Sequence, residues 1–183
     1  MTCVVALRTD HSILLGSDSL ASDTDIGVHR VDPKVFRLGE FGIGYGGSFR
    51  FGQIVQYFFN PPKITKKDKQ DLFSYMIRKF VPELRKTLDR NDFDLEELVG
   101  CRLIVVVRGE IFYIEPDLHV GRDVDEFTAI GSGQKYAYGS LLTTVPLNNL
   151  SAYDKVSAAL EAAAYFAISV SPPFHIIEVE NEN

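Results

Sequence analysis

The 183-residue sequence has few cysteines, no excess of basic residues and no long apolar segment. Its two cysteines, Cys3 and Cys101, lie in separate apolar runs, which predicts buried free thiols rather than a disulfide. With 19 basic against 25 acidic residues the net charge is −6, so nucleic acid is not an expected partner. No apolar run approaches the roughly 20 residues that span a bilayer, so no membrane partner is expected. The start also has no basic and apolar leader, and together these features predict a cytoplasmic protein.

The sequence has no motif for metal, nucleotide or serine-based catalysis. The four histidines are scattered and no C-x-x-C pair occurs, so no metal site is expected. No G-x-x-x-x-G-K-[ST] loop is present, and "GIGYGG" lacks the third glycine of a dinucleotide fingerprint. The segment "GSDSL" does not match the G-x-S-x-G turn of serine hydrolases. We therefore expect neither a metal ion nor an organic cofactor.

Length and patterning predict a single domain over residues 1–183, because no linker, composition break or internal repeat divides the chain. Apolar runs bounded by turn residues predict strands, and the first two of these form a hairpin. A second hairpin is expected around the turn at Arg108-Gly109. The predicted strands are Thr2–Leu7, Ser12–Ser17, Asp32–Leu38, Phe41–Gly47, the two arms of Cys101–Glu115, the segment "FTAIGSG" and Phe174–Val179.

Helices are predicted for four segments. Apolar residues recur at three- and four-residue spacing from Leu72 to Leu88, which gives one apolar stripe, and Pro82 within it predicts a kink or a break. The basic cluster "KITKKDK" is expected to be a loop leading into this helix. Ser151 and Asp154 have the spacing of a capping box before the last helix. The order of elements fits two sheets with helices outside them. The other three helical segments are "SFRFGQIVQYFF", "QKYAYGSLLTT" and "KVSAALEAAAYFAI".

Thr2 follows Met1 directly, and a threonine at the start of a chain carries its own base. Its α-amine, with an ordinary pKa of about 7.7–8.0, can accept the Oγ proton once Met1 is removed, which the small Thr2 side chain favours. A lysine ammonium nearby would keep that amine neutral, a carboxylate would hold the lysine, and backbone N–H groups would bind an oxyanion. The sequence offers Asp18 after the second strand, Lys34 in "DPKVFRL" and Gly47 between a strand and a helix.

The spacing of three of these residues is specific. Asp18 lies 16 residues after Thr2, and Lys34 lies 16 residues after Asp18. The motifs "GYGGS", "AIGSGQKYAYGSLL" and "SPPFHIIEVE" follow in that order. On these residues the sequence resembles the proteasome β-subunit and HslV branch of the N-terminal nucleophile hydrolases. The resemblance covers nearly the whole chain and is weakest from Asn60 to Gly100. It implies an α+β fold, a four-layer αββα sandwich with two mainly antiparallel sheets between helical layers.

The resemblance also implies a catalytic role for five residues. Thr2 would be the nucleophile, and its freed amine would be the general base. Lys34 would tune the pKa of that amine, and Asp18 would orient Lys34. Ser132 in "GSG" would hydrogen-bond near the amine and assist the proton transfer, while the Gly47 N–H would donate to the oxyanion.

Two aromatic residues flank the glycine turn. By the same resemblance, Tyr45 and Phe49 would shape the pocket for the substrate side chain and leave limited room in it. The sequence departs from the family at one place. Many proteasome subunits have an aspartate three residues before a Ser-Gly near the end of the last helix, whereas here Ser171 precedes a proline and Ile168 occupies the aspartate position. A supporting carboxylate is therefore missing there.

The function implied is that of a threonine-type hydrolase that cleaves peptide bonds, active only after Met1 is removed. It would act on peptides or unfolded proteins as a subunit of a homo-oligomeric ring, and the family adds an ATP-dependent unfoldase as a partner. Two alternatives stay open. One is a catalytically inactive proteasome-like scaffold or binding subunit. The other is an amidase or acylase that acts on small molecules.

Overall fold

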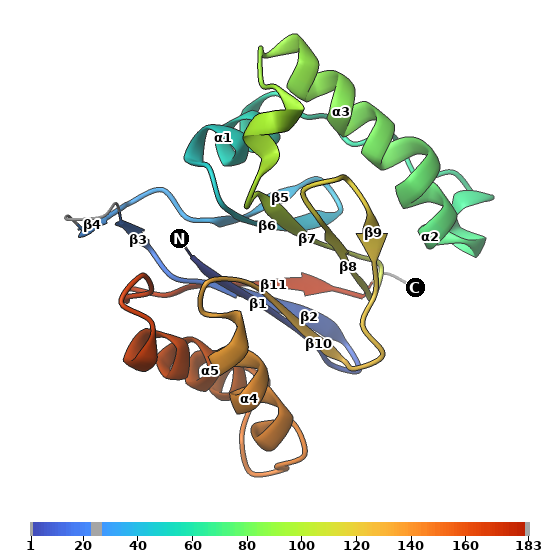
Figure 1. Cartoon of the computed structure of the whole chain (residues 1–183). Coiled ribbons are helices and arrows are strands. Elements are labelled where there is room, and N and C mark those ends of the chain that lie inside the picture. The colour runs from blue at the N-terminus through green and yellow to red at the C-terminus, as the bar shows by residue number, and fades with distance from the viewer. Residues whose placement is uncertain (1, 23–26, 182–183) are drawn as a thin grey trace.

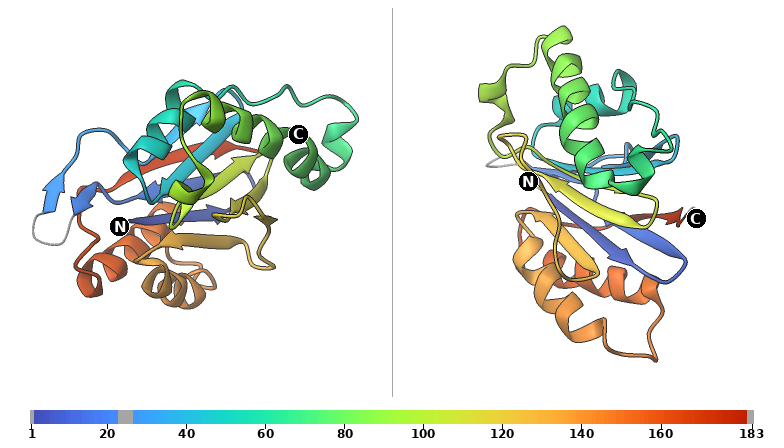
Figure 2. Two further views of the ribbon diagram at one scale, coloured as in Figure 1. Left: turned by 45° about the horizontal axis from the view of Figure 1, so that its top comes forward. Right: turned by 90° about the vertical axis from the view of Figure 1, so that its right-hand side faces the viewer.

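The computed structural model describes residues 2–22 and 27–181 and has a layered α+β architecture. In Figure 1 one helical layer lies above two stacked sheets, and a second helical layer lies below them. The two further views in Figure 2 show the same arrangement, with helices outside and sheets inside. The predicted αββα sandwich is confirmed.

The first sheet has β1 near its centre. The strand order is β10-β1-β2-β11, and all neighbours are antiparallel. The register pairs Cys3 with Gly131 and Val4 with Ser17, so the start of β1 lies beside the ends of β10 and β2. The strands are β1 (Cys3–Arg8), β2 (Ser12–Ser17), β10 (Phe127–Gly131) and β11 (His175–Glu180).

The second sheet has the order β5-β6-β7-β8-β9 and is also antiparallel. Arg108 and Gly109 form the predicted turn, with φ angles of 50° and 75° that suit a two-residue hairpin. A small separate hairpin of β3 and β4, which the sequence did not indicate, follows Asp18. These strands are β3 (Leu20–Ser22), β4 (Gly27–His29), β5 (Val35–Leu38), β6 (Phe41–Gly46), β7 (Arg102–Val107), β8 (Glu110–Ile114) and β9 (Val120–Gly121).

The helices lie where the sequence predicts them. Pro82 lies at the start of α3, directly after the π-helix η2. The wider π turn accommodates a ring that would otherwise clash with the carbonyl four residues earlier, so the chain continues as a helix. Ser151 and Asp154 form the predicted capping box of the last helix. The elements are α1 (Phe49–Tyr57), η1 (Asp68–Gln70), α2 (Leu72–Tyr75), η2 (Met76–Phe80), α3 (Val81–Arg90), η3 (Leu95–Leu98), α4 (Gln134–Thr144) and α5 (Ala152–Phe166).

Three apolar clusters fill the spaces between the layers. One lies between the second sheet and α1–α3, one between the first sheet and α4–α5, and one between the two sheets. Cys3 and Cys101 are buried free thiols in the two outer clusters, as predicted. None of the helices in the described part of the chain is long and apolar enough to cross a bilayer.

Strand β6 brings the two sheets close together through an alternation of glycine with large residues. A Cβ on Gly42 would lie 2.6 Å from Val179, and one on Gly44 would lie 2.5 Å from Val4. The third glycine of this face, Gly46, lies against Thr2, because a Cβ there would be 3.6 Å from Thr2 Cγ2. The glycines of "FGIGYGG" therefore allow the first sheet, and with it the start of β1, to approach the second.

Candidate active site

Thr2 lies at the start of β1, against the loop that follows β10. Its side chain is buried, with 2% of the residue exposed. Its backbone N–H donates to Ser132 Oγ at 3.2 Å, and Ser132 Oγ donates to the Thr2 carbonyl at 3.2 Å. A Cβ on Gly131 would lie 2.2 Å from the Thr2 carbonyl oxygen, so a glycine is required for this approach. Met1 and its removal lie outside the described residues.

Asp18 directly follows β2 and lies beside the start of β1, because β1 and β2 are paired there. One carboxylate oxygen, Oδ1, accepts hydrogen bonds from the Cys3 N–H and from Lys34 Nζ, both at 2.9 Å. The other, Oδ2, accepts from the Leu20 N–H at 3.0 Å. With 0% exposure, this carboxylate connects the backbone next to Thr2 with the Lys34 ammonium.

Lys34 is as deeply buried as its partner, with 1% of the residue exposed. Its ammonium donates to Asp18 and, at 2.7 Å, to the Leu20 carbonyl. Burial lowers the pKa of Lys34 below its ordinary value, while the charge of Asp18 and its hydrogen bond oppose that shift. The structure thus places four of the five predicted catalytic residues, Thr2, Asp18, Lys34 and Ser132, in one contiguous cluster at the start of β1.

The turn after β6 closes this cluster on the side of the second sheet. Gly47 has a φ of +96°, and a Cβ there would lie 2.7 Å from Cys101 Cα and from the Gly100 carbonyl oxygen. Ser48 then caps α1, accepting a hydrogen bond from the Phe51 N–H at 3.4 Å. The Gly47 N–H has no acceptor among the described residues. Because the preceding residue, Gly46, lies against Thr2, this N–H is the candidate donor for an oxyanion.

Aromatic rings fill the space beside this turn. The buried Tyr45 ring contacts Phe49 edge-on, with ring centres 6.3 Å apart, and packs against Phe36 at 6.4 Å. It also covers Gly52, where a Cβ would lie 2.2 Å from the ring. Burial raises the pKa of Tyr45 to about 12. The Arg30 guanidinium lies 4.4 Å from the centre of the half-buried Phe49 ring. The Tyr45 ring therefore belongs to the core between the second sheet and α1–α3, with Phe49 packed against it.

One polar residue of the site was missed from the sequence. Ser169 is buried, and its hydroxyl lies 2.8 Å from Ser132 Oγ. The family resemblance pointed to Ser171 in this segment. In the structure Ser171 Oγ lies 3.1 Å from His29 Nε2, and Ser169 rather than Ser171 contacts Ser132. Ile168 is 96% exposed. The only sequence signal for Ser169 is a second serine two positions before Ser171, in a non-helical segment with no periodicity to orient it.

Arg30 and Asp32 also border the site without having been predicted. Their side chains form an ion pair at 2.5 Å, and the hydrogen bond from Arg30 lowers the pKa of the Asp32 carboxyl. The charge of Arg30 adds a small lowering effect on the pKa of Lys34. The residues beside the Phe49 ring therefore carry one positive and one negative charge, which cancel.

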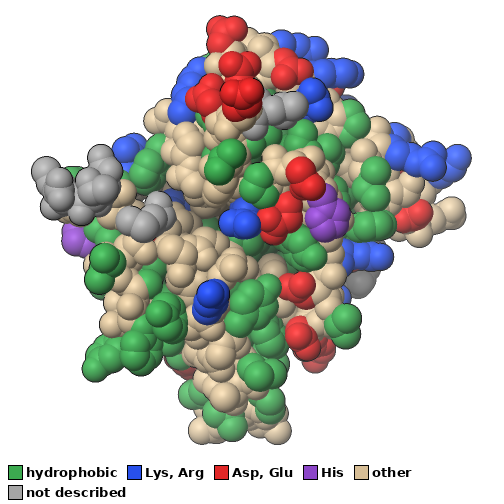
Figure 3. Space-filling model, in the orientation of Figure 1, with side chains coloured by type: hydrophobic (Ala, Val, Ile, Leu, Met, Phe, Trp, Pro, Cys, Tyr) green, Lys and Arg blue, Asp and Glu red, His purple; other side chains and the backbone are tan. Residues whose placement is uncertain are grey.

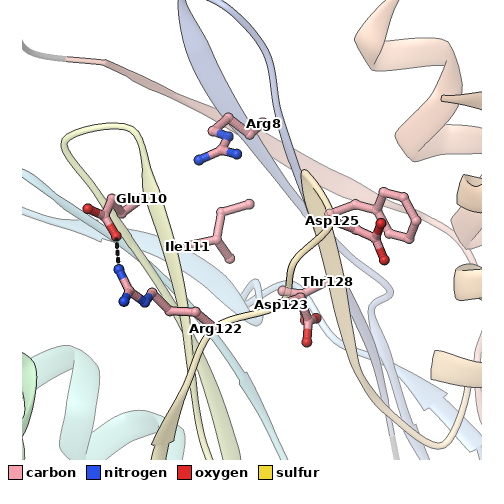
Figure 4. Close-up of a pocket in the computed structure, with 8 residues that line it drawn as sticks. Arg8, Glu110, Ile111, Arg122, Asp123, Asp125 and Thr128 are labelled. Atoms are coloured by element: carbon pink, nitrogen blue, oxygen red, sulfur yellow. Dashed lines mark hydrogen bonds and ion pairs between the residues drawn. The ribbon is translucent and has the colours of Figure 1, made fainter. Parts of the chain in front are cut away.

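A separate cavity of about 330 Å3 lies at the other end of β1 (Figure 4). Arg8 points into it from β1, and Glu110 pairs with Arg122 at 3.0 Å across one side. None of the predicted catalytic residues lines it. Thr2 and Arg8 mark opposite ends of one strand, so this cavity is distinct from the cluster around Thr2.

This arrangement of layers, with a threonine at the start of the central strand β1, is the fold of the N-terminal nucleophile hydrolases in its HslV-like form. One similar solved structure is Thiobacillus denitrificans BPH in complex with epoxomicin, with a TM-score of 0.80 at 19% identity over 99% of this chain and 100% of that one. HslV from Trypanosoma brucei has a TM-score of 0.74 at 18% identity, covering 97% and 99% of the two chains. Anbu, an ancestral beta-subunit from Yersinia bercovieri, has 0.68 at 14% identity, covering 98% and 81%.

These likenesses establish the fold alone, because the identities are below one in five. No protein-family model and no curated protein matches the sequence. Any catalytic activity therefore has to be inferred from the residues of the site.

Proposed function

We propose that this chain, in the form that begins at Thr2, is a threonine-type hydrolase of peptide bonds. The observation that carries the proposal is the buried Asp18–Lys34 pair, hydrogen-bonded to the backbone N–H next to Thr2. Burying two charges is expensive unless their geometry is good, and a hydrophobic pair would often stabilise a fold as well. A buried ion pair at the start of β1, bonded to the backbone next to Thr2, is therefore better explained by a role in catalysis than by a contribution to stability.

In the proposed reaction the Thr2 amine accepts the proton of Thr2 Oγ, and Oγ attacks the carbonyl carbon of the substrate. The Gly47 N–H donates to the resulting oxyanion. The protonated amine then gives its proton to the departing amine as the amide bond breaks, which leaves an ester on Thr2. A water molecule, deprotonated by the same amine, attacks the ester and releases the acid. While Met1 is attached, the Thr2 nitrogen is an amide and has no basic lone pair.

The neighbouring residues support this proton transfer. The Lys34 ammonium disfavours a second positive charge on the Thr2 amine and so keeps it neutral near pH 7. Asp18 holds Lys34 charged in spite of its burial. The contact of Ser132 with the Thr2 nitrogen, and of Ser169 with Ser132, supports a hydroxyl relay for the proton. Because Tyr45 and Phe49 occupy the neighbouring space, the substrate side chain next to the cleaved bond is small.

Assembly into a ring of identical subunits is part of the proposal, with an ATP-dependent unfoldase as the partner that the family resemblance implies. Exposed aromatic residues on the α4–α5 layer support an association of copies. Tyr165 is 83% and Phe166 61% exposed, and their ring centres are 4.9 Å apart. Tyr136 stacks on the other side of Phe166 at 5.2 Å.

The first prediction is that Thr2 is labelled by peptide epoxyketones, the class to which epoxomicin belongs. Thr2 Oγ adds to the ketone and the Thr2 amine opens the epoxide, so only a free N-terminal threonine gives the doubly linked ring. We expect faster labelling with alanine than with leucine beside the ketone. The adduct is mapped by mass spectrometry on protein prepared to begin at Thr2, and peptide cleavage is measured in parallel.

Two controls accompany this experiment: protein that retains Met1, and the Thr2→Ala variant, neither of which should be labelled. Absence of an adduct from folded protein with a verified Thr2 start would contradict the catalytic proposal and favour a scaffold. An adduct without cleavage of any peptide in a broad library would favour the small-molecule amidase.

A further inference from the structure

The helical layer formed by α1–α3 has a basic end. Residues 63–79 contain six lysines and arginines against two aspartates, a net charge of +4. Only Lys79 among them forms an ion pair within the described chain, with Asp68 at 2.7 Å. We call the exposed and unpaired remainder the basic end: Lys63, Lys66, Lys67, Lys69 and Arg78.

The same layer has an acidic end. Residues 89–97 contain five acidic residues against one arginine, a net charge of −4. Arg90 pairs with Glu83, outside this segment, and in the described part of the chain the five acids form no ion pair. Asp94 and Glu97 cap the short helix η3 and hold the segment in a fixed turn. The acidic end comprises Asp89, Asp92, Asp94, Glu96 and Glu97, all exposed.

These two ends lie at opposite limits of one helical rod. In Figure 3 acidic side chains gather at the top of the view, over the end of α3, and basic side chains gather at the right, over α2 and the loop before it. Along this helical stretch the nearest charges of the two ends, Arg78 and Asp89, are 11 residues apart, which is about 17 Å at 1.5 Å per residue. One copy therefore cannot pair its own two ends.

Each end also has a cavity or an exposed apolar side chain beside its charges. A cavity of about 300 Å3 opens at the basic end and is lined in part by Lys67, Arg78 and Lys79. At the acidic end, the turn of η3 is followed by Val99, which is 84% exposed. Ile77, 46% exposed, lies beside Arg78 and offers an apolar surface for such a contact.

We infer that the basic end of one copy binds the acidic end of the next copy, and that this contact connects neighbouring subunits. The inference rests on the proposed assembly of identical copies and names the surface that mediates it. Equal and opposite charge at two different places on one chain favours a head-to-tail contact, which produces a ring when the rotation closes and an open helix when it does not. Because the charges are exposed, salt screens their attraction over a Debye length of about 10 Å at 0.1 M.

The experiment measures the mass of the full chain in solution by light scattering and sedimentation. One variant carries Lys66→Glu and Lys67→Glu, and the other carries Asp89→Lys and Glu96→Lys. None of these four side chains makes a hydrogen bond or ion pair to another described residue. We expect wild type to assemble at low salt and to dissociate as salt rises, and each variant alone to remain a single copy.

Mixing the two variants is the decisive measurement. The first variant keeps an intact acidic end and the second an intact basic end, and the two reversed ends are opposite in charge to each other, so the mixture should assemble again although neither variant does so alone. Asp10→Lys, in the exposed turn between β1 and β2, changes the charge by the same amount as one of these substitutions without touching either end and should leave the assembly unchanged. Circular dichroism verifies that each variant is folded.

Assembly of either double variant to the mass of wild type would overturn the inference while leaving ring formation intact. Wild type that stays a single copy at all salt and protein concentrations would overturn it as well. The epoxyketone label on Thr2 is independent of both results, so a failure of this interface is distinguishable from a failure of the proposed chemistry.

Discussion

At the scale of single residues, the unusual property of this protein is where it buries charge. Asp18 and Lys34 are 0% and 1% exposed and bond to each other at 2.9 Å. Among the described residues, every side-chain hydrogen bond of the pair goes to Cys3, Leu20 or the partner, all close to the start of β1. The pair is thus inseparable from the position of Thr2.

Replacing Asp18 by asparagine should move the alkaline limit of activity to lower pH. In wild type, activity rises as the Thr2 amine loses its proton and falls as Lys34 loses its own, at a pH below 10.5 because burial lowers the pKa of Lys34. Without the Asp18 charge the two largest effects that raise the pKa of Lys34 are lost, so the alkaline limb should shift down by about 1–3 pH units. The rate of Thr2 labelling against pH measures this.

Loss of the carboxylate also leaves a buried ammonium unpaired, which should lower the free energy of unfolding by about 3–5 kcal/mol. The rate of Thr2 labelling against pH is therefore measured at a temperature where circular dichroism shows that the variant is folded. Asp10→Asn, in the exposed turn between β1 and β2, removes the same charge far from Lys34 and should not move the limb. An unchanged limb in Asp18→Asn would disprove the assigned role of Lys34.

At the scale of elements, the turn from β6 into α1 joins the fold to the site. Gly47 combines a φ of +96° with backbone atoms of Gly100 and Cys101 close to where a Cβ would be. Backbone cannot move aside as a flexible side chain can, so a larger residue has to displace the turn. Displacement would move the Gly47 N–H, which is the proposed oxyanion donor.

Gly47→Ala should therefore reduce the free energy of unfolding and the rate of Thr2 labelling more than a Gly→Ala substitution at a position that has a positive φ but no close neighbours. Gly39→Ala is the matched control, since its φ is +60° and nothing lies within 4 Å of its Cβ position. We expect Gly39→Ala to cost about 1 kcal/mol, and Gly47→Ala to cost about 1–3 kcal/mol more from overpacking. Urea unfolding and the rate of Thr2 labelling distinguish the two, and equal losses would refute the steric argument.

Element prediction from the sequence worked where local signals were strong. The apolar stripe, the capping box at Ser151 and the Arg108-Gly109 turn each depend on residues a few positions apart, and all three are confirmed. The β3–β4 hairpin was missed because its strands have three residues each, too few for a period to show.

At the scale of the whole molecule, the glycine face of β6 sets the distance between the sheets. Gly42 and Gly44 face Val179 and Val4 across the inner core, while the alternate residues of β6 pack against the helical layer. This asymmetry lets the two sheets approach without a cavity.

Gly44→Ala should destabilise the protein by about 1–3 kcal/mol, because its methyl group would lie 2.5 Å from Val4 and 3.2 Å from Val35. Gly139→Ala provides the opposite control. It lies inside α4 with nothing within 4 Å of its Cβ position, so alanine should stabilise by about 0.5–1 kcal/mol. Thermal and urea unfolding measure both, and a stabilising Gly44→Ala would show that the sheets can separate freely.

The sequence by itself determined the longer helices and strands, the fold class and the candidate set Thr2, Asp18 and Lys34. Helix and strand patterns repeat within a few residues, and the spacing of the three site residues is visible in one dimension. Only the tertiary structure decided that Ser169 rather than Ser171 reaches Ser132, and that the Tyr45 ring packs edge-on against Phe49. It also decided that opposite charges lie at the two ends of one helical rod. Such contacts join segments brought together by sheet pairing and layer packing, and no local rule along the chain specifies them.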